Sequence, residues 1–296
     1  MTLAIRPAKL TRRRSPHARL FGTGELAPGT RCAVIVAHPA DEIVGAGCLI
    51  SKLVDVSILH VTDGVAVENA ERAKRTQEVD ALRQQCLMAL AVANVPKDRI
   101  IDLWVPDHRA ANQLADLTKR ITTFLQQTGA DIVLTHPYEG GHPDHDATSF
   151  ASHAAVRLMI ESGLRPPVIF ELGLYPSNDE QNKITGFLPG SNGEVTTLVL
   201  DDRSRELKQR MVACLNGHGK HLNGAAIDSE RFRRPPKYDF SVPPRKGKLH
   251  YENFDWAISA REWQALAGKA LTQLFSQPRN RQTGEPPNRE CKMPGK

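Results

Sequence analysis

Histidine and carboxylate side chains gather in two short segments of this sequence, residues 37–42 and 136–146. The first segment reads Ala-His-Pro-Ala-Asp-Glu, and the second contains the run Gly-His-Pro-Asp-His-Asp. His38 and Asp41 stand three residues apart on a turn that enters a predicted helix, so both can face one point, which His145 can reach from the second segment. Two neutral imidazoles and one carboxylate are a typical zinc set, with the fourth position left to water.

Each segment also has an interpretation without chemistry. A His-Pro pair can simply punctuate a loop, and Asp41 and Glu42 are favourable residues for the first turn of a helix. The zinc hypothesis therefore requires a fold that brings the two segments together.

Buried strands alternate with amphipathic helices along the first part of the chain. Apolar and periodic runs predict strands at 32–37, 56–61, 99–103, 131–135 and 168–172, and helices at 42–53, 69–93, 112–127 and 147–161. This alternation, with short connections, predicts a Rossmann-like, doubly wound α/β fold with a mostly parallel sheet and helices on both faces. Ligands bind beyond the carboxyl ends of such strands. The first and fourth strands are neighbours in the common order, so the two segments should meet.

The chain is expected to hold one folded domain between two irregular ends. Residues 1–30 read as a basic N-terminal arm, residues 31–276 as a single α/β domain, and residues 277–296 as a disordered polar tail. Within the domain, we predict loops at 177–194 and 231–248, a strand at 196–200, and helices at 202–215 and 260–275.

The composition and charge of the chain limit the kinds of binding partner that we expect. The net charge of +6 comes largely from basic runs in 1–20 and 231–248, which we interpret as solvated segments. Few aromatic residues interleave with them, so a nucleic-acid partner is not expected. No apolar run approaches the ~20 residues of a membrane helix, and early basic residues interrupt any signal-peptide core. We therefore expect a cytoplasmic protein, for which a homo-oligomer is compatible with the sequence.

Several other kinds of site are disfavoured. The five cysteines form no C-x-x-C pair, so any metal is expected to be held by His, Asp or Glu. Gly45-Ala46-Gly47 is only a G-x-G and lies inside a predicted helix, which argues against a dinucleotide site and favours close packing of that helix. No G-x-S-x-G elbow or Walker-type phosphate loop is present.

The paired segments resemble the motifs A-H-P-D-D-E and H-P-D-H of the PIG-L/LmbE family of zinc-dependent N-deacetylases. The likeness covers most of residues 31–220. It includes Thr62-Asp63-Gly64, Arg75-x-x-Glu78, Pro106-Asp107 and a later Lys208…His218 stretch.

The resemblance implies roles for individual residues. It implies one zinc ion per chain on His38, Asp41 and His145, and it implies that His142 donates a proton or stabilises the oxyanion. Asp144 would hold the ring of His142. Arg75 and Asp107 match positions near the sugar, although a helix-surface charge and a loop cap explain them equally well.

Ala40 departs from the family pattern, which has an aspartate there as the general base. Loss of a general base typically costs ~10²–10⁴ in rate. The alanine could be a substitution introduced to trap a bound state, the mark of a natural pseudoenzyme, or harmless if Glu139 or Asp146 serves as base. We favour the first explanation, because no other site residue has changed.

The resemblance thus implies a hydrolase that removes an N-acetyl group from an amino sugar, either a small molecule or a glycoconjugate, and that is weakened or inactivated by Ala40. The alternative is a catalytically silent, zinc-containing module that binds sugars or regulates a partner.

Overall fold

The computed structural model describes residues 20–21, 29–66, 72–176, 184–188, 193–215, 227–254, 256 and 258–276. Its main sheet has seven strands in the order β3-β2-β1-β4-β5-β9-β8. The strands are β1 (Arg31–Val36), β2 (Asp55–Ala66), β3 (Ile100–Asp107), β4 (Ile132–Thr135), β5 (Val168–Leu172), β8 (Val195–Val199) and β9 (Ser229–Arg233). Two short strands, β6 (Tyr175–Pro176) and β7 (Ile184–Gly186), pair separately.

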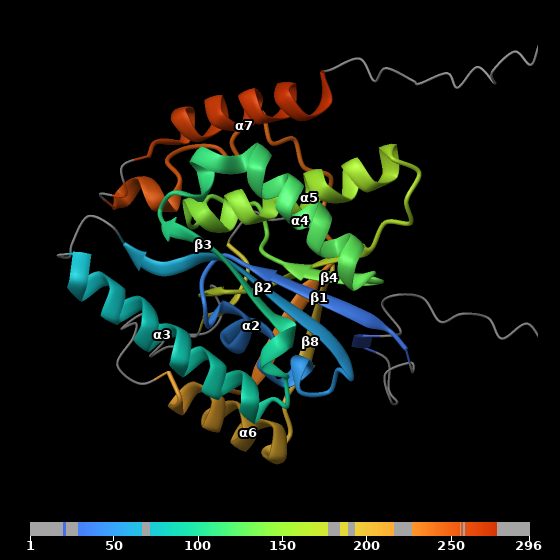
Figure 1. Cartoon of the computed structure of the whole chain (residues 1–296), viewed down its shortest axis with the longest axis vertical. Coiled ribbons are helices and arrows are strands. Elements are labelled where there is room, and N and C mark those ends of the chain that lie inside the picture. The colour runs from blue at the N-terminus through green and yellow to red at the C-terminus, as the bar shows by residue number, and fades with distance from the viewer. Residues whose placement is uncertain are drawn as a thin grey trace, which may run out of the picture.

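Helices cover both faces of this sheet (Figure 1). They are α2 (Asp41–Ile50), α3 (Arg72–Val92), α4 (Leu114–Thr128), α5 (Pro143–Glu161), α6 (Asp202–Ala213) and α7 (Ala260–Phe275). Helices α2, α3 and α6 lie on one face, and α4, α5 and α7 lie on the other. The pairs β1–β2, β2–β3, β1–β4 and β4–β5 are parallel, whereas β9 runs antiparallel to β5 and β8. The predicted doubly wound α/β fold is confirmed.

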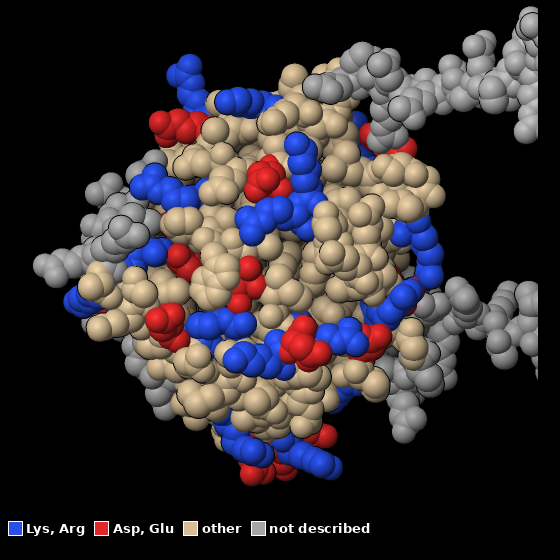
Figure 2. Space-filling view, viewed as in Figure 1, with Lys and Arg blue, Asp and Glu red and all other residues tan. Residues whose placement is uncertain are grey.

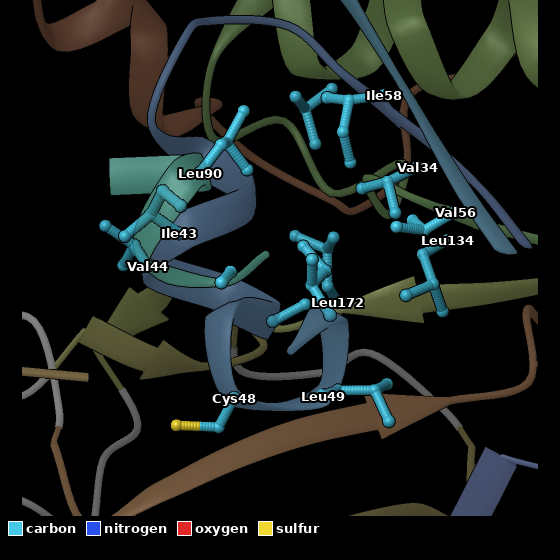
Figure 3. Packing of buried hydrophobic residues seen from close by; sticks show 14 of the residues in the cluster. Val34, Ile43, Val44, Cys48, Leu49, Val56, Ile58, Leu90, Leu134 and Leu172 are labelled. Atoms are coloured by element: carbon cyan, nitrogen blue, oxygen red, sulfur yellow. The ribbon is translucent and has the colours of Figure 1, made fainter. Parts of the chain in front are cut away.

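Alternate residues of β1 feed two separate cores. Cys32, Val34 and Val36 pack with α2 and α3, in the cluster that Figure 3 shows. Ala33 and Ile35 pack with α4 and α5 on the opposite face. All five are essentially buried, as expected of a central parallel strand that is covered on both sides.

Two glycines let α2 lie close to its neighbours. A Cβ atom on Gly45 would stand 2.9 Å from Cδ1 of Leu172, and one on Gly47 would stand 3.0 Å from Cε of Met211. The packing role expected for these glycines therefore has a steric basis.

Strand β7 lies inside the predicted loop 177–194, and two further differences from the expected elements have a clear physical reason. Helix α5 begins at Pro143 rather than at residue 147, because proline is favoured at the first helical position. Strand β9 lies partly inside the predicted basic loop. Its sequence, Ser-Glu-Arg-Phe-Arg, lacks the apolar pattern of a buried strand. Arg233 is nevertheless buried, because it forms an ion pair with Glu171 at 2.7 Å.

Surface charge is mixed on the face shown in Figure 2, where Lys and Arg alternate with Asp and Glu. The predicted tail lies outside the described residues, as do His218 and most of the predicted arm. Within the described ranges, no helix is long and apolar enough to cross a membrane.

Candidate metal centre and active site

Three predicted ligand atoms converge at the carboxyl ends of β1 and β4. Nδ1 of His38 lies 3.2 Å from Oδ2 of Asp41 and 3.2 Å from Nε2 of His145. His145 Nε2 lies 3.5 Å from the same Asp41 oxygen. Donor atoms about 2.0–2.1 Å from a tetrahedral zinc ion are about 3.3–3.4 Å apart. The three side chains therefore fit one zinc ion as they stand.

Two neighbouring strands bring these donors together. Strand β1 pairs directly with β4, and their carboxyl ends lead into α2 and into the loop before α5. The turn after β1 is closed by a hydrogen bond from Asp41 N–H to the His38 carbonyl at 3.2 Å. Because α5 begins at Pro143, His145 lies in its first turn and faces the same point.

Asp107 holds the outer nitrogen of His38. Its Oδ1 atom lies 2.8 Å from His38 Nε2, which leaves the Nδ1 lone pair directed at Asp41 and His145. A carboxylate behind a metal-binding imidazole fixes its tautomer and raises its basicity. The resemblance implies that Asp107 lies near the sugar, which stays a prediction, and in the structure its carboxylate contacts the predicted ligand His38.

The cluster is anionic enough to attract a cation. Burial opposes a charge on His38, but Asp107, Asp144 and Asp41 raise the pKa of His38 well above its usual 6.5. Burial lowers the pKa of His145 to about 3, so this imidazole is neutral at pH 7 and can act as a ligand.

His136 lies in the same cluster but is not suited to be a ligand. Its Nε2 atom accepts the backbone N–H of Ala37 at 2.8 Å, so the lone pair that approaches Asp41 to within 3.3 Å is already used. Its ring stacks on that of His145, with centroids 3.9 Å apart. His136 therefore supports a ligand and ties β1 to β4.

His142 is placed as a hydrogen-bond donor. It is the N-cap residue of α5, and its Nδ1 atom accepts the N–H of Asp144 at 3.2 Å. The proton of the neutral ring must then reside on Nε2, so a metal ion at that atom would conflict with the cap. Burial and the neighbouring His38 and His145 lower the pKa of His142 well below 6.5.

The carboxylate of Asp144 lies away from the position predicted for it. It accepts the backbone N–H groups of His108 at 2.6 Å and Ala110 at 3.0 Å. Of Asp144, it is the backbone N–H that contacts the His142 ring. The expected carboxylate–imidazole pair is replaced by a helix cap, because Asp144 is buried beneath the loop that follows β3.

Ala40 occupies a conformation that suits another residue type. It has φ 90° and ψ −16°, in the left-handed region, and it is the N-cap of α2 without a side-chain cap. Aspartate and asparagine tolerate the left-handed region better than alanine, and both are preferred N-caps. The local backbone is therefore at odds with alanine, as the family motif suggests.

The two other carboxylates considered as bases are engaged elsewhere. Glu139 pairs with Arg233 at 3.0 Å and accepts the N–H of Leu188 at 3.0 Å. Asp146 Oδ1 accepts the N–H groups of Glu139 and Gly140, each at 3.1 Å, and burial raises its pKa to about 8. Both carboxylates stabilise the loop that follows β4, which weakens the case for either as a base.

Arg75 braces the carboxyl-terminal end of β2. It pairs with Asp63 and donates to the Val65 carbonyl at 2.9 Å, while Asp63 accepts the N–H of Asp107 at 3.3 Å. These contacts support the site from behind. A contact between Arg75 and the sugar stays a prediction.

Two aromatic residues near the site were not predicted, Trp256 beside His142 and Phe254 beside Trp256. The ring centroid of Trp256 lies 4.5 Å from the ring centroid of His142 and 5.2 Å from that of His108. Phe254 stacks on Trp256, with ring centroids 4.5 Å apart. These residues belong to a loop far along the chain, and no spacing in the sequence signals their approach.

Fold and site together define an α/β protein with a candidate metal centre at the carboxyl edge of a doubly wound sheet. Residues 33–156 match the family model described as PIG-L, GlcNAc-PI de-N-acetylase. The resemblance to the PIG-L family is therefore confirmed over these residues. A search of curated protein sequences finds no significant match.

Solved structures share the fold at low identity. N,N'-diacetylchitobiose deacetylase from Pyrococcus horikoshii is 18% identical with a TM-score of 0.50, over 69% of this chain and 83% of that one. A deacetylase of teicoplanin biosynthesis is 17% identical with a TM-score of 0.53, over 69% and 97%. A conserved protein from Thermus thermophilus is 17% identical with a TM-score of 0.51, over 74% and 100%.

Proposed function

We propose that this chain is built as a zinc-dependent N-deacetylase for an amino sugar, either a small molecule or a glycoconjugate. The observation that carries the proposal is the convergence of His38, Asp41 and His145, with pairwise donor distances of 3.2–3.5 Å. The family description, a de-N-acetylase of a GlcNAc glycolipid, supports the substrate class. Zinc held there would polarise the acetyl carbonyl and make a nearby water more acidic.

The protein groups supply the remaining chemistry. His142, with its proton on Nε2, donates a hydrogen bond to the oxyanion that forms when water adds to the carbonyl. An aspartate at position 40 would take a proton from the water and return it to the departing amine, so that acetate and the free amine form. Asp107 keeps His38 in the tautomer that presents Nδ1.

Ala40 removes the base and favours a second candidate, a zinc-containing sugar-binding module without hydrolysis. Both candidates require the same ligand set. They differ in whether the restored carboxylate produces turnover.

The test compares this chain with its Ala40→Asp and Ala40→Asn variants in the release of free amine from N-acetyl-hexosamine glycosides, after zinc loading. The asparagine variant is the matched control, because it relieves the same backbone conformation without providing a base. Turnover by the aspartate variant alone, at least about 10²-fold above this chain, supports the deacetylase. Equal turnover by this chain would contradict the assignment of the base.

A further inference from the structure

A second group of metal-binding side chains lies behind the catalytic cluster, inside the core between α2, β2 and α3. Glu42, His60 and Cys86 come from these three elements, and all three are fully buried. Buried polar side chains without a structural purpose are costly. Here three of the strongest metal ligands available to a protein face one another.

The separations of the donor atoms are close to those of a first coordination shell. Cys86 Sγ lies 3.1 Å from Glu42 Oε1, His60 Nε2 lies 3.3 Å from Glu42 Oε2, and the sulfur and nitrogen atoms are 3.8 Å apart. Around a zinc ion with Zn–S near 2.3 Å and Zn–N near 2.0 Å, adjacent donors are separated by about 3.3–3.6 Å. Coordination by both Glu42 oxygens, one of which faces Cys86 and the other His60, would give four donor atoms without water.

The surrounding contacts orient the ligands. His60 Nδ1 hydrogen-bonds to Asp102 Oδ1 at 2.9 Å, and His60 and Asp102 are register partners on β2 and β3. Arg83 pairs with Asp102 at 2.6 Å. The Nδ1 proton is thereby held outward, and the Nε2 lone pair faces Glu42 and Cys86, as a carboxylate–histidine–zinc arrangement requires.

A divalent cation would balance the charge of this site. A thiolate and a carboxylate contribute two negative charges, which one zinc ion neutralises, and the Asp102–Arg83 pair is neutral by itself. A thiolate ligand favours zinc over magnesium or calcium. We propose that Glu42, His60 and Cys86 form a second, closed zinc site, structural rather than catalytic because none of its side chains reaches solvent.

The proposed site goes beyond the deacetylase function and departs from the expectation that any metal is held without cysteine. It also touches the catalytic loop, because Glu42 Oε2 accepts the N–H of Ala40 at 3.1 Å. A filled site would hold the backbone of residue 40 in place behind the first metal centre.

The competing arrangement has a proton in place of the metal. A doubly protonated His60 could donate to Glu42 and Asp102, and the Cys86 thiol could donate to Glu42. The two arrangements differ in whether Cys86 is a metal-bound thiolate, which can be measured directly.

The test replaces zinc by Co²⁺ in the full chain and records the ultraviolet spectrum. A thiolate-to-cobalt charge-transfer band is expected from Cys86. The band is specific to the second site, because the predicted ligands of the catalytic cluster contain no sulfur. Its absence from the cobalt-loaded chain would overturn the proposal. This measurement needs no variant, so it stays decisive if substitutions at the buried site prevent folding.

The second part of the test measures the number of zinc ions bound per chain. The zinc-loaded chain is expected to hold two ions, Cys86→Ala one, and the matched buried control Cys48→Ala two. His145→Ala should lose only the catalytic ion and keep the thiolate band. Failure of the deacetylase assay therefore leaves this result intact, whereas equal zinc content in Cys86→Ala and the unaltered chain contradicts the second site.

Discussion

The backbone N–H of Asp144 donates to Nδ1 of His142 at 3.2 Å, so the first turn of α5 determines which nitrogen of this ring carries the proton. A helix N-terminus also disfavours the imidazolium. His142 is therefore arranged as a neutral donor, comparable to an amide in an oxyanion hole, and not as a strong acid.

Replacement of His142 should test that role. In the Ala40→Asp background, His142→Ala is expected to lower kcat by about 10²–10³-fold, the usual cost of one oxyanion donor. Zinc content should not change, because the ring is not a ligand. His142→Asn, which restores a donor, should recover part of the rate, and loss of zinc in His142→Ala would show that the ring is a ligand after all.

Position 40 should respond in stability as well as in activity. Ala40→Asn removes an alanine from the left-handed region and adds an N-cap side chain, so we expect the free energy of unfolding to rise by about 1 kcal/mol. Chemical denaturation of the zinc-free chain and variant measures this change. A less stable Ala40→Asn would mean that the buried surroundings of residue 40 have no room for a larger side chain.

Asp107 should act on metal affinity more than on sugar affinity. Its carboxylate lies 2.8 Å from Nε2 of His38, so Asp107→Asn is expected to weaken zinc binding at the catalytic cluster by about 10–100-fold. Competition with a zinc chelator measures the affinity. If zinc affinity is unchanged and only KM rises in the Ala40→Asp background, the role suggested by the family, near the sugar, is the correct one.

His153 should make the fold sensitive to acid. It is half-buried against Tyr238 and Phe240, and burial lowers its pKa to about 4, below the value near 6.5 of the unfolded chain. Between these values the unfolded state binds more protons, so the free energy of unfolding falls as the pH falls from 6.5 to 4.

Substitution of His153 should flatten that dependence. His153→Leu is expected to remove at least about 1 kcal/mol of the loss in this window, as measured by urea unfolding at a series of pH values. His250→Gln, at an exposed histidine, is the control and should leave the slope unchanged. An unaltered slope in His153→Leu would assign the acid sensitivity to other groups.

The sequence predicted the elements that carry strong periodicity. Apolar spacing predicted the strand at 32–37, the helix at 260–275 and the alternation of strands and helices between them. A sheet with a layer of helices on each face follows from that alternation. Strand β9 was not predicted, because Arg233 and Glu230 are charged residues of the kind usually found at the surface. They are buried here because Arg233 pairs with Glu171 and Glu230 pairs with Lys208. A buried charge is recognised only through its partner.

Residue types and spacing were also enough to propose a ligand set. His38 and Asp41 are held by one local turn, and His145 follows a motif at the end of the neighbouring strand, so sequence alone determined which three side chains could meet. The position of Ala40 as a missing base came from the resemblance to the family motif rather than from spacing, and it stays a prediction.

The tertiary structure decided which residues contact and support these side chains. Asp107 supports His38, a backbone amide rather than a carboxylate holds His142, and Cys86 meets His60 and Glu42 across three elements. These contacts join residues that are far apart in the sequence or that point away from each other along the chain. Local patterns record which side chains a segment offers, whereas the partner of a buried polar atom is set by the packing of whole helices and strands.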